Sequence, residues 1–276
     1  MNNPRSMKIA IQEDMLPGPT LEDRFYQAAD LGLQGIEFWS EHLVGQAGKI
    51  EKLNGTRGVR AASVNHGHRS RFLDPDPGER HRALEELEEA LILAGRIGAL
   101  GVVFVPHFSA PLLPDLSPWM DAVLLERNLL SAQLNGLAVQ AQKAGVQLWV
   151  EPVNHYETHL LNRLADAATL VAPLSHPNLG IVADLFHMAL EEEDISKAIS
   201  DHANLIGHVH LADSNRRLPG LGTTDFKQAL TTLSKTNYSG WLALECDQPG
   251  DNQVNAAWYV KHLPESLTLI KQAFLS

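Results

Sequence analysis

Four short apolar stretches in the second half of this chain end in a carboxylate or a histidine. They read LWVE, IVAD, GHVH and LALE, and their last residues are Glu151, Asp184, His210 and Glu245. A charged group in an apolar segment is costly unless it is paired or binds a metal. Oxygen donors with one imidazole nitrogen suit a divalent cation, whereas the single cysteine, Cys246, argues against a structural zinc cluster. We therefore expect one divalent metal ion at these four residues.

These stretches belong to a longer alternation of short apolar segments with longer amphipathic ones. Nearly continuous apolar segments rich in Val, Ile and Leu are typical of parallel strands that are buried on both faces. The sequence predicts eight such strands, at Lys8–Gln12, Gly35–Trp39, Ala61–Asn65, Gly101–Pro106, Val146–Glu151, Gly180–Asp184, Ile206–Leu211 and Trp241–Glu245.

Helical spacing of apolar residues marks the segments between these strands. Eight strand-then-helix units predict an α/β protein with a single (β/α)8 TIM barrel. An open, doubly wound sheet is the alternative, but no G-x-G-x-x-G motif follows the first strand. We expect a disordered tail at residues 1–6 and one catalytic barrel domain at residues 7–276. The helices are expected at Leu21–Leu31, Glu41–Leu53, Arg80–Ile97, Asp121–Ala144, Leu164–Val171, Asp194–His202, Phe226–Ser234 and Asn255–Phe274.

The carboxyl ends of the strands converge on one face of such a barrel, where active sites lie. His66 and His107 follow the third and fourth strands, so we expect them to line the same pocket. Single residues also have structural interpretations: Glu151 as a buried ion-pair partner, Asp184 as a helix cap and His208 as a core histidine. The joint pattern of acid, acid, histidine and acid at four consecutive strand ends favours the metal site.

Composition narrows the classes of protein that the chain can belong to. Its 276 residues carry 22 Lys and Arg against 33 Asp and Glu, and this net charge of −11 argues against nucleic acid as the partner. No apolar run approaches the length of a membrane span, and the first residues lack the layout of a signal peptide. One cysteine excludes an internal disulfide framework. We expect a cytoplasmic protein that binds a small molecule and neither nucleic acid nor membrane.

The sequence resembles the xylose-isomerase-like TIM-barrel superfamily of sugar isomerases and epimerases along essentially its whole length. The stretches EPVNHYETHLLN, VADLFHM, GHVHLADSNRRLPGLGTTDF and ALECD carry this resemblance. In motif it is most similar to the ketose 3-epimerases of the tagatose and psicose type. The resemblance implies an enzyme of carbohydrate metabolism that acts on a keto sugar or a sugar-acid derivative through an enediolate. It also implies one divalent metal, manganese first, with magnesium, cobalt or zinc as alternatives.

The same resemblance implies roles for individual residues. The four strand-end residues named above hold the metal, and His187, Arg216 and Glu157 bind the substrate. In the mechanism that we expect, Glu151 removes a proton next to the carbonyl and Glu245 returns one to the opposite face of the planar intermediate.

Other functions stay open, because a shared fold does not choose among reactions. The same carbanion serves an aldose–ketose isomerase or a lyase, either an inosose-type dehydratase or a keto-acid decarboxylase. A metal nuclease like endonuclease IV is a remote alternative. The endonuclease IV family uses an Asp-x-His pair after the seventh strand, and Lys227 stands here in place of that histidine. A non-catalytic sugar-binding barrel is a further one. We also expect a homo-oligomer, with Trp119, Trp258 and Tyr259 as candidate interface residues. The alternative for these aromatic residues is a place in the hydrophobic core.

Overall fold

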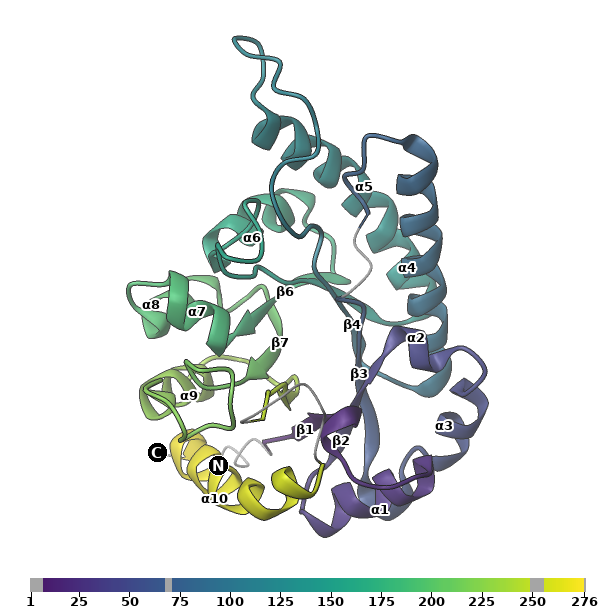
Figure 1. The fold of residues 1–276 in the computed structure, drawn as a ribbon, viewed down its shortest axis with the longest axis vertical. Coiled ribbons are helices and arrows are strands. Elements are labelled where there is room, and N and C mark those ends of the chain that lie inside the picture. The colour runs from purple at the N-terminus through teal and green to yellow at the C-terminus, as the bar shows by residue number, and fades with distance from the viewer. Residues whose placement is uncertain (1–6, 68–70, 249–255, 276) are drawn as a thin grey trace.

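The protein is described by a computed structural model of residues 7–67, 71–248 and 256–275. The tail expected at residues 1–6 lies outside the described residues. Within them, parallel strands β1 to β8 pair in chain order, and pairing of β1 with both β2 and β8 closes the barrel (Figure 1). The predicted (β/α)8 barrel is thereby confirmed. The strands are β1 (Ile9–Gln12), β2 (Gly35–Trp39), β3 (Arg60–Asn65), β4 (Gly101–Phe104), β5 (Gln147–Val150), β6 (Leu179–Asp184), β7 (Ile206–Leu211) and β8 (Leu242–Leu244).

Helices surround the ring of strands (Figure 1). None of the helices in the described ranges is long and apolar enough to cross a membrane. Short 3-10 turns lie at Glu13–Met15, Thr56–Gly58 and Ala172–Leu174. The helices are α1 (Leu21–Asp30), α2 (Ser40–Leu43), α3 (Ala47–Leu53), α4 (Pro77–Ile97), α5 (Ala122–Ala144), α6 (Leu164–Val171), α7 (Leu185–Glu191), α8 (Ile195–His202), α9 (Phe226–Ser234) and α10 (Ala256–Leu275).

Two helices differ from the prediction. The single helix expected over residues 41–53 is divided into α2 and α3, because Gly45 between them adopts a left-handed φ of +77° that interrupts the helix. Helix α7 was missed, because it begins directly after β6 without a turn signal. Asp184 caps it by accepting hydrogen bonds from the backbone N–H groups of Phe186 (2.7 Å) and His187 (3.3 Å). The structural interpretation of Asp184 is therefore correct, alongside its place in the candidate site.

Two tryptophans, Trp149 and Trp241, are buried among small and aliphatic side chains. Trp149 is buried, and a Cβ atom placed on Gly207 would lie 2.0 Å from its Nε1, so the ring needs a glycine at that position. His208 stacks on Trp149 with ring centroids 5.0 Å apart and is fully buried, as its interpretation as a core histidine predicts. Trp149 packs with Val103 and Val182, and Trp241 packs with three alanines, so buried side chains fill the barrel interior.

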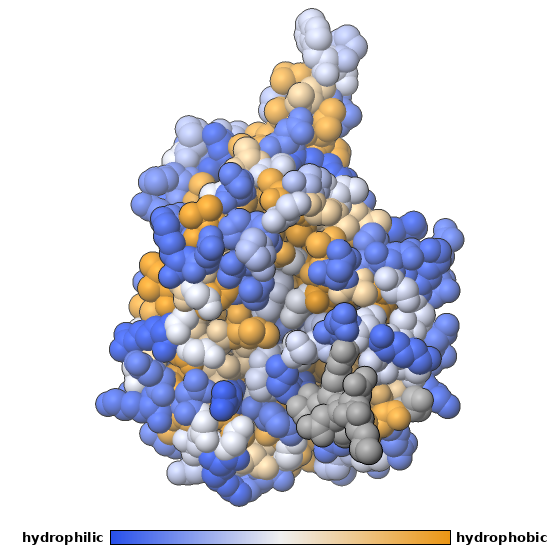
Figure 2. Space-filling view, turned by 180° about the vertical axis from the view of Figure 1, so that it is seen from behind, coloured by the Kyte–Doolittle hydropathy of each residue, from blue (hydrophilic) through white to orange (hydrophobic). Residues whose placement is uncertain are grey.

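The loop at residues 105–121, between β4 and α5, projects from the body of the protein and is called the arm here (Figure 1). Trp119, on the arm, is 87% exposed, and apolar residues gather below its tip (Figure 2). Tyr259 is buried in the core and Trp258 packs against it. Tyr259 was therefore wrong as a candidate interface residue, because its ring is covered by its own chain, whereas Trp119 is accessible.

Candidate metal centre

The four residues expected to bind a metal converge at the carboxyl end of the barrel. One ligand atom from each of Glu151, Asp184, His210 and Glu245 lies within 4.8 Å of the others. The Nδ1 atom of His210 is 2.7 Å from Glu151 Oε1, 3.0 Å from Glu245 Oε2 and 3.8 Å from Asp184 Oδ2. Three carboxylates and one imidazole nitrogen therefore face a common point, as the ligands of a divalent cation do.

Strand register brings these groups together. Asp184 and His210 are direct partners in the pairing of β6 with β7, and Glu245 directly follows β8. The side-chain amides of Gln12 and Asn65 donate to Glu245 Oε1 at 2.8 Å and 3.0 Å. Sequence reasoning gave neither amide a role. Only their position could have indicated a role. Each is the last residue of a predicted strand, and the carboxyl ends of the strands meet on one face of the barrel.

The electrostatics of the cluster favour added positive charge. Burial, and then the carboxylate of Glu245, raise the pKa of Asp184 to about 6. Burial also raises the pKa of Glu151, and the neighbouring His210 offsets only part of this effect. For Glu245, His210 and Arg216 outweigh burial and lower the pKa to about 2. Burial opposes charge on His210 as well, but Glu245 and other carboxylates raise its pKa well above the usual value. Three carboxylates thus share one site with a single histidine, and a bound cation would balance their excess negative charge.

His187 lies beside the cluster in a fixed tautomer. Its Nδ1 accepts a hydrogen bond from the backbone N–H of Asn154 at 3.1 Å, and the side-chain amide of Asn154 lies 2.8 Å from the same atom. Burial lowers the pKa of His187 and so favours the neutral ring. The remaining proton is then on Nε2, which lies 3.7 Å from Asp184 Oδ2. His187 therefore presents a neutral N–H donor to the space beside the cluster.

Arg216 and Glu157 form a second polar group near the cluster. Arg216 Nη1 lies 3.1 Å from Glu157 Oε1, which also accepts a hydrogen bond from the side chain of Asn154 at 3.0 Å. The guanidinium lies over the ring of Phe186, 5.0 Å from its centroid. Burial opposes its charge, but the carboxylates of Glu245 and Asp184 raise the pKa of Arg216 further. The structure thus places three of the predicted substrate-binding residues, His187, Arg216 and Glu157, around Asn154 and beside the metal cluster.

Asp213 builds the loop that carries Arg216. Its carboxylate accepts hydrogen bonds from the backbone N–H groups of Ser214 (2.8 Å), Gly220 (2.8 Å) and Thr224 (3.0 Å). These bonds outweigh burial and lower the pKa of Asp213. They hold the backbone turn in which Arg216 adopts a left-handed φ of +60°. Sequence reasoning left Asp213 without a role, because its hydrogen-bond partners are backbone groups.

His66 and His107 are buried near the carboxyl ends of β3 and β4, but neither belongs to the metal cluster. His66 Nδ1 lies 2.7 Å from Ser40 Oγ, and His107 Nε2 lies 2.9 Å from the carbonyl oxygen of Ala110. Their role in lining the pocket stays a prediction. The metal groupings found in the described part of the chain include neither residue, so the nuclease alternative gains no support.

A buried carboxylate on α5 connects the arm to the loop that carries Glu157 and His159. Glu126 is fully buried, and its Oε1 accepts hydrogen bonds from the backbone N–H groups of Leu112 (2.7 Å) and Leu113 (3.1 Å) on the arm. Its Oε2 lies 2.6 Å from Nε2 of His159, whose Nδ1 lies 2.8 Å from the carbonyl oxygen of Ser109. The backbone N–H of Ser109 in turn donates to the carbonyl oxygen of Glu157 at 2.6 Å. Sequence reasoning did not single out Glu126, which lies in a long amphipathic helix.

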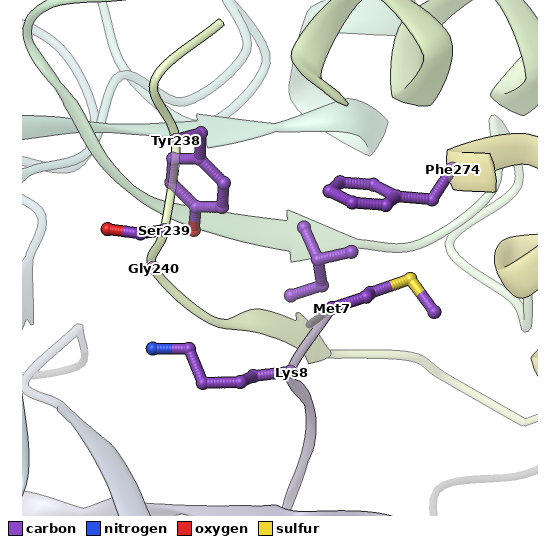
Figure 3. Close-up of a pocket in the computed structure, with 7 residues that line it drawn as sticks. Met7, Lys8, Tyr238, Ser239, Gly240 and Phe274 are labelled. Atoms are coloured by element: carbon purple, nitrogen blue, oxygen red, sulfur yellow. The ribbon is translucent and has the colours of Figure 1, made fainter. Parts of the chain in front are cut away.

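The opposite, amino-terminal end of the barrel has a different chemistry. A pocket of about 260 Å³ lies there, next to β1 and β8 (Figure 3). Its lining contains one charged side chain, Lys8, whose Nζ lies 5.1 Å from the centroid of the Trp241 ring. Burial lowers the pKa of Lys8. Among the described residues, no acid or histidine lines this pocket, in contrast to the cluster at the carboxyl end. The pocket is lined by Met7, Lys8, Tyr238, Ser239, Gly240, Leu242 and Phe274.

Comparison with known sequences places the barrel in a family. The profile of the family described as "Xylose isomerase-like TIM barrel" matches residues 25–265. The 3-dehydro-D-guloside 4-epimerase of Escherichia coli is 29% identical over 244 residues, which are 87% of this chain and 92% of that protein. The D-psicose 3-epimerase of Agrobacterium fabrum is 35% identical over 112 residues, which are 41% of this chain and 39% of that protein.

Solved structures extend the likeness to the whole barrel. The crystal structure of a 3-keto-D-glucoside 4-epimerase from E. coli superposes with a TM-score of 0.85 and 25% identity, covering 97% of this chain and all of that chain. A D-psicose 3-epimerase crystallised in the presence of D-fructose gives a TM-score of 0.84 at 21% identity, covering 97% of this chain and 99% of that chain. At this identity, the second likeness concerns the fold alone.

Proposed function

The chain belongs to the xylose isomerase-like TIM barrel family, and from this premise we propose that it is a divalent-metal-dependent epimerase of a keto sugar. The observation that carries the proposal is the pair of carboxylates beside His210 Nδ1, Glu151 at 2.7 Å and Glu245 at 3.0 Å. They come from β5 and β8, so they approach the centre from separate sides of the barrel. The relatives described above are sugar epimerases, and none of them is a lyase or a binding protein.

Glu151, Asp184, His210 and Glu245 would hold the cation. Their donor atoms lie within 4.8 Å of one another, and three carboxylates this close repel each other unless positive charge joins them. When bound, the cation supplies Lewis acidity, which polarises the substrate carbonyl and makes the adjacent C–H acidic. We propose manganese first and magnesium, cobalt or zinc as alternatives, since an oxygen-rich set with one nitrogen accommodates several divalent ions.

The two glutamates move the proton. Glu151 accepts it from the carbon next to the carbonyl, and the electron pair of the broken C–H bond enters the enediolate. Glu245 then delivers a proton to the opposite face, so a new C–H bond forms with inverted configuration. The raised pKa of Glu151 suits a group that must bind a proton near neutral pH.

The neighbouring donors stabilise the enediolate. The Nε2–H of neutral His187 and the guanidinium of Arg216 donate to the oxygens on which negative charge develops. Asn154 fixes the His187 tautomer through Nδ1 and also contacts Glu157, the partner of Arg216. The oxyanion donors are therefore held in place before the substrate arrives.

A 3-keto glycoside is the first candidate substrate. The relative named 3-dehydro-D-guloside 4-epimerase matches 87% of this chain, whereas the match to the D-psicose 3-epimerase covers 41%. In both names the inverted carbon is next to the carbonyl carbon, as the proton-transfer mechanism requires. A free ketose inverted at carbon 3 is the second candidate.

Exchange of solvent deuterium into the substrate tests this function. Metal-loaded protein is incubated in D₂O with a 3-keto glucoside and, separately, with D-fructose and D-psicose, and products are followed by NMR. We expect deuterium at the carbon next to the carbonyl together with the inverted isomer. Exchange with migration of the carbonyl would assign an isomerase instead. Absence of exchange with every substrate, from protein that contains its metal, would refute proton transfer.

Stabilisation by metal should depend on pH. Since the pKa of Asp184 is raised to about 6, protonation of Asp184 stabilises the metal-free fold at acid pH, and this stabilisation is lost as the pH rises through about 6. A cation must displace that proton at low pH but not at high pH. We therefore expect the increase in Tm on adding Mn²⁺ to be larger at about pH 7.5 than at about pH 5. Differential scanning fluorimetry with and without Mn²⁺ at both pH values measures it. An equal metal-induced shift at both pH values would contradict it.

The cytoplasmic location and the homo-oligomer expected from the sequence stay predictions. Of the three aromatic candidates for an interface, Trp119 on the arm is exposed. Its position on the arm would let a partner subunit pack at the carboxyl end of the barrel.

A further inference from the structure

A further group of polar side chains, distinct from Arg216 and Glu157, lies in the barrel directly beneath the candidate metal centre. Its centre is Glu37 on β2, a carboxylate with no exposed surface. Glu37 Oε1 lies 3.2 Å from Nε2 of His210, and Oε2 lies 2.9 Å from Nε2 of His208. The hydroxyl of Ser63 donates to Oε2 at 2.6 Å, and the amide of Gln12 lies 3.4 Å from Oε1. Each of these four contacts joins the carboxylate to a group that can donate a hydrogen bond.

The ring of His210 connects this group to the metal centre. Its Nδ1 faces the carboxylates of Glu151 and Glu245, and its Nε2 faces Glu37. An imidazole that binds a metal through one nitrogen commonly donates the other N–H to a carboxylate, which fixes the tautomer and the ring orientation. The ring is fully buried, so a flipped or rotated ring would leave a carboxylate without its donor.

We propose that Glu37 is a positioning residue, which holds the Nε2–H of His210 and thereby presents the Nδ1 lone pair to the cation. The inference rests on the metal site of the proposed function. Glu37 acts through a second route as well, because the Gln12 amide that approaches it donates to Glu245 Oε1 at 2.8 Å. Glu37 therefore orients two of the four metal ligands from below, one directly and one through an amide.

A competing assignment would make Glu37, His208 and His210 a metal site in their own right, since their ligand atoms also lie within 4.8 Å of one another. The contacts favour a proton at His210 instead. Ser63 donates to Oε2 of Glu37 and Gln12 to Oε1, so both carboxylate oxygens already accept hydrogen bonds. The ring of His208 stacks on Trp149. The two assignments differ in stoichiometry, one bound ion against two.

The test compares Glu37→Gln with a matched control, Glu126→Gln. Both positions are fully buried carboxylates paired with a histidine, but Glu126 pairs with His159 outside the metal centre. Isothermal titration calorimetry with Mn²⁺ is expected to show one site in the wild type, with affinity reduced about 10- to 100-fold in Glu37→Gln and unchanged in Glu126→Gln. Heteronuclear NMR of histidine-labelled, Zn²⁺-loaded protein should show a protected Nε2–H on His210 that is lost in Glu37→Gln.

Three results would overturn the proposal: wild-type affinity in folded Glu37→Gln, an Nε2 without its proton, or a second ion per chain that disappears in this variant. If Glu37→Gln does not fold, Ser63→Ala removes the 2.6 Å hydrogen bond to Oε2 without changing charge, and its Mn²⁺ affinity should fall by a smaller factor. Wild-type protein that binds no metal would instead refute the metal site itself. Wild-type protein that binds metal but exchanges no sugar proton would refute the proposed function and leave the role of Glu37 intact.

Discussion

Replacing Glu245 by glutamine is expected to stop inversion of the sugar while leaving half of the reaction in place. Glu151 still removes the proton from one epimer and returns a solvent proton to the same face. Turnover to the other epimer should fall by about 10² to 10⁴, the contribution typical of a positioned acid or base. Glu151→Gln should show the mirror behaviour, because Glu245 serves the opposite face. Each variant is thus expected to exchange a different epimer with solvent.

The measurement is NMR of each pure epimer in D₂O with each variant at saturating metal, with metal content determined alongside because both residues are candidate ligands. Glu51→Gln is the control. Glu51 is exposed on α3, and its Oε2 lies 3.1 Å from Nε of Arg96. This control should retain full turnover. Inversion at the wild-type rate in either active-site variant would contradict the assignment, and exchange of the same epimer by both would rule out two separate bases.

Removing the guanidinium of Arg216 is expected to cause the second largest loss. Arg216→Met keeps the aliphatic stem that lies against Phe186 but removes the charge beside the enediolate. The loss of one preorganised oxyanion donor typically lowers kcat by about 10² to 10³. Metal affinity should not fall, because Arg216 is a positive neighbour of Asp184 and Glu245 and its removal leaves these carboxylates more available to a cation.

Arg217→Met is the matched control, because Arg217 is the next residue and is exposed. Steady-state kinetics with the keto sugar and Mn²⁺ titration of both variants separate the two effects. A kcat for Arg216→Met within a factor of two of wild type would show that the guanidinium does not stabilise the charge. A loss of Mn²⁺ affinity would instead indicate that Arg216 supports the metal centre.

The sequence predicts most of this architecture because its signals are local. Strands such as β5 and β6 are continuous apolar segments, and each begins or ends within about two residues of its predicted bounds, the usual uncertainty of helix and strand ends. The four candidate ligands could be found because they interrupt the apolar pattern at strand ends. The helix break at Gly45 was missed, since glycine inside an amphipathic segment does not reveal its φ.

Residues that act through others were harder to find. Glu37 lies within the apolar stretch GIEFW, where a single acid has several explanations, and its partners come from β1, β3 and β7. Asn154, in the loop after β5, sets the tautomer of His187, which lies in helix α7. Such pairings depend on strand order and register across the barrel, and no local pattern encodes them.

The hydrogen bonds of Glu126 link the arm to the loop that carries Glu157. The arm and the Glu157 loop share one buried carboxylate, so a displacement of either segment breaks bonds that hold the other. By thermodynamic linkage, any factor by which sugar binding at Glu157 changes the affinity of a contact on the arm equals the factor by which that contact changes the affinity for sugar. The outer surface of the arm and the Glu157 loop beside the metal centre are therefore joined by one continuous set of hydrogen bonds through Glu126.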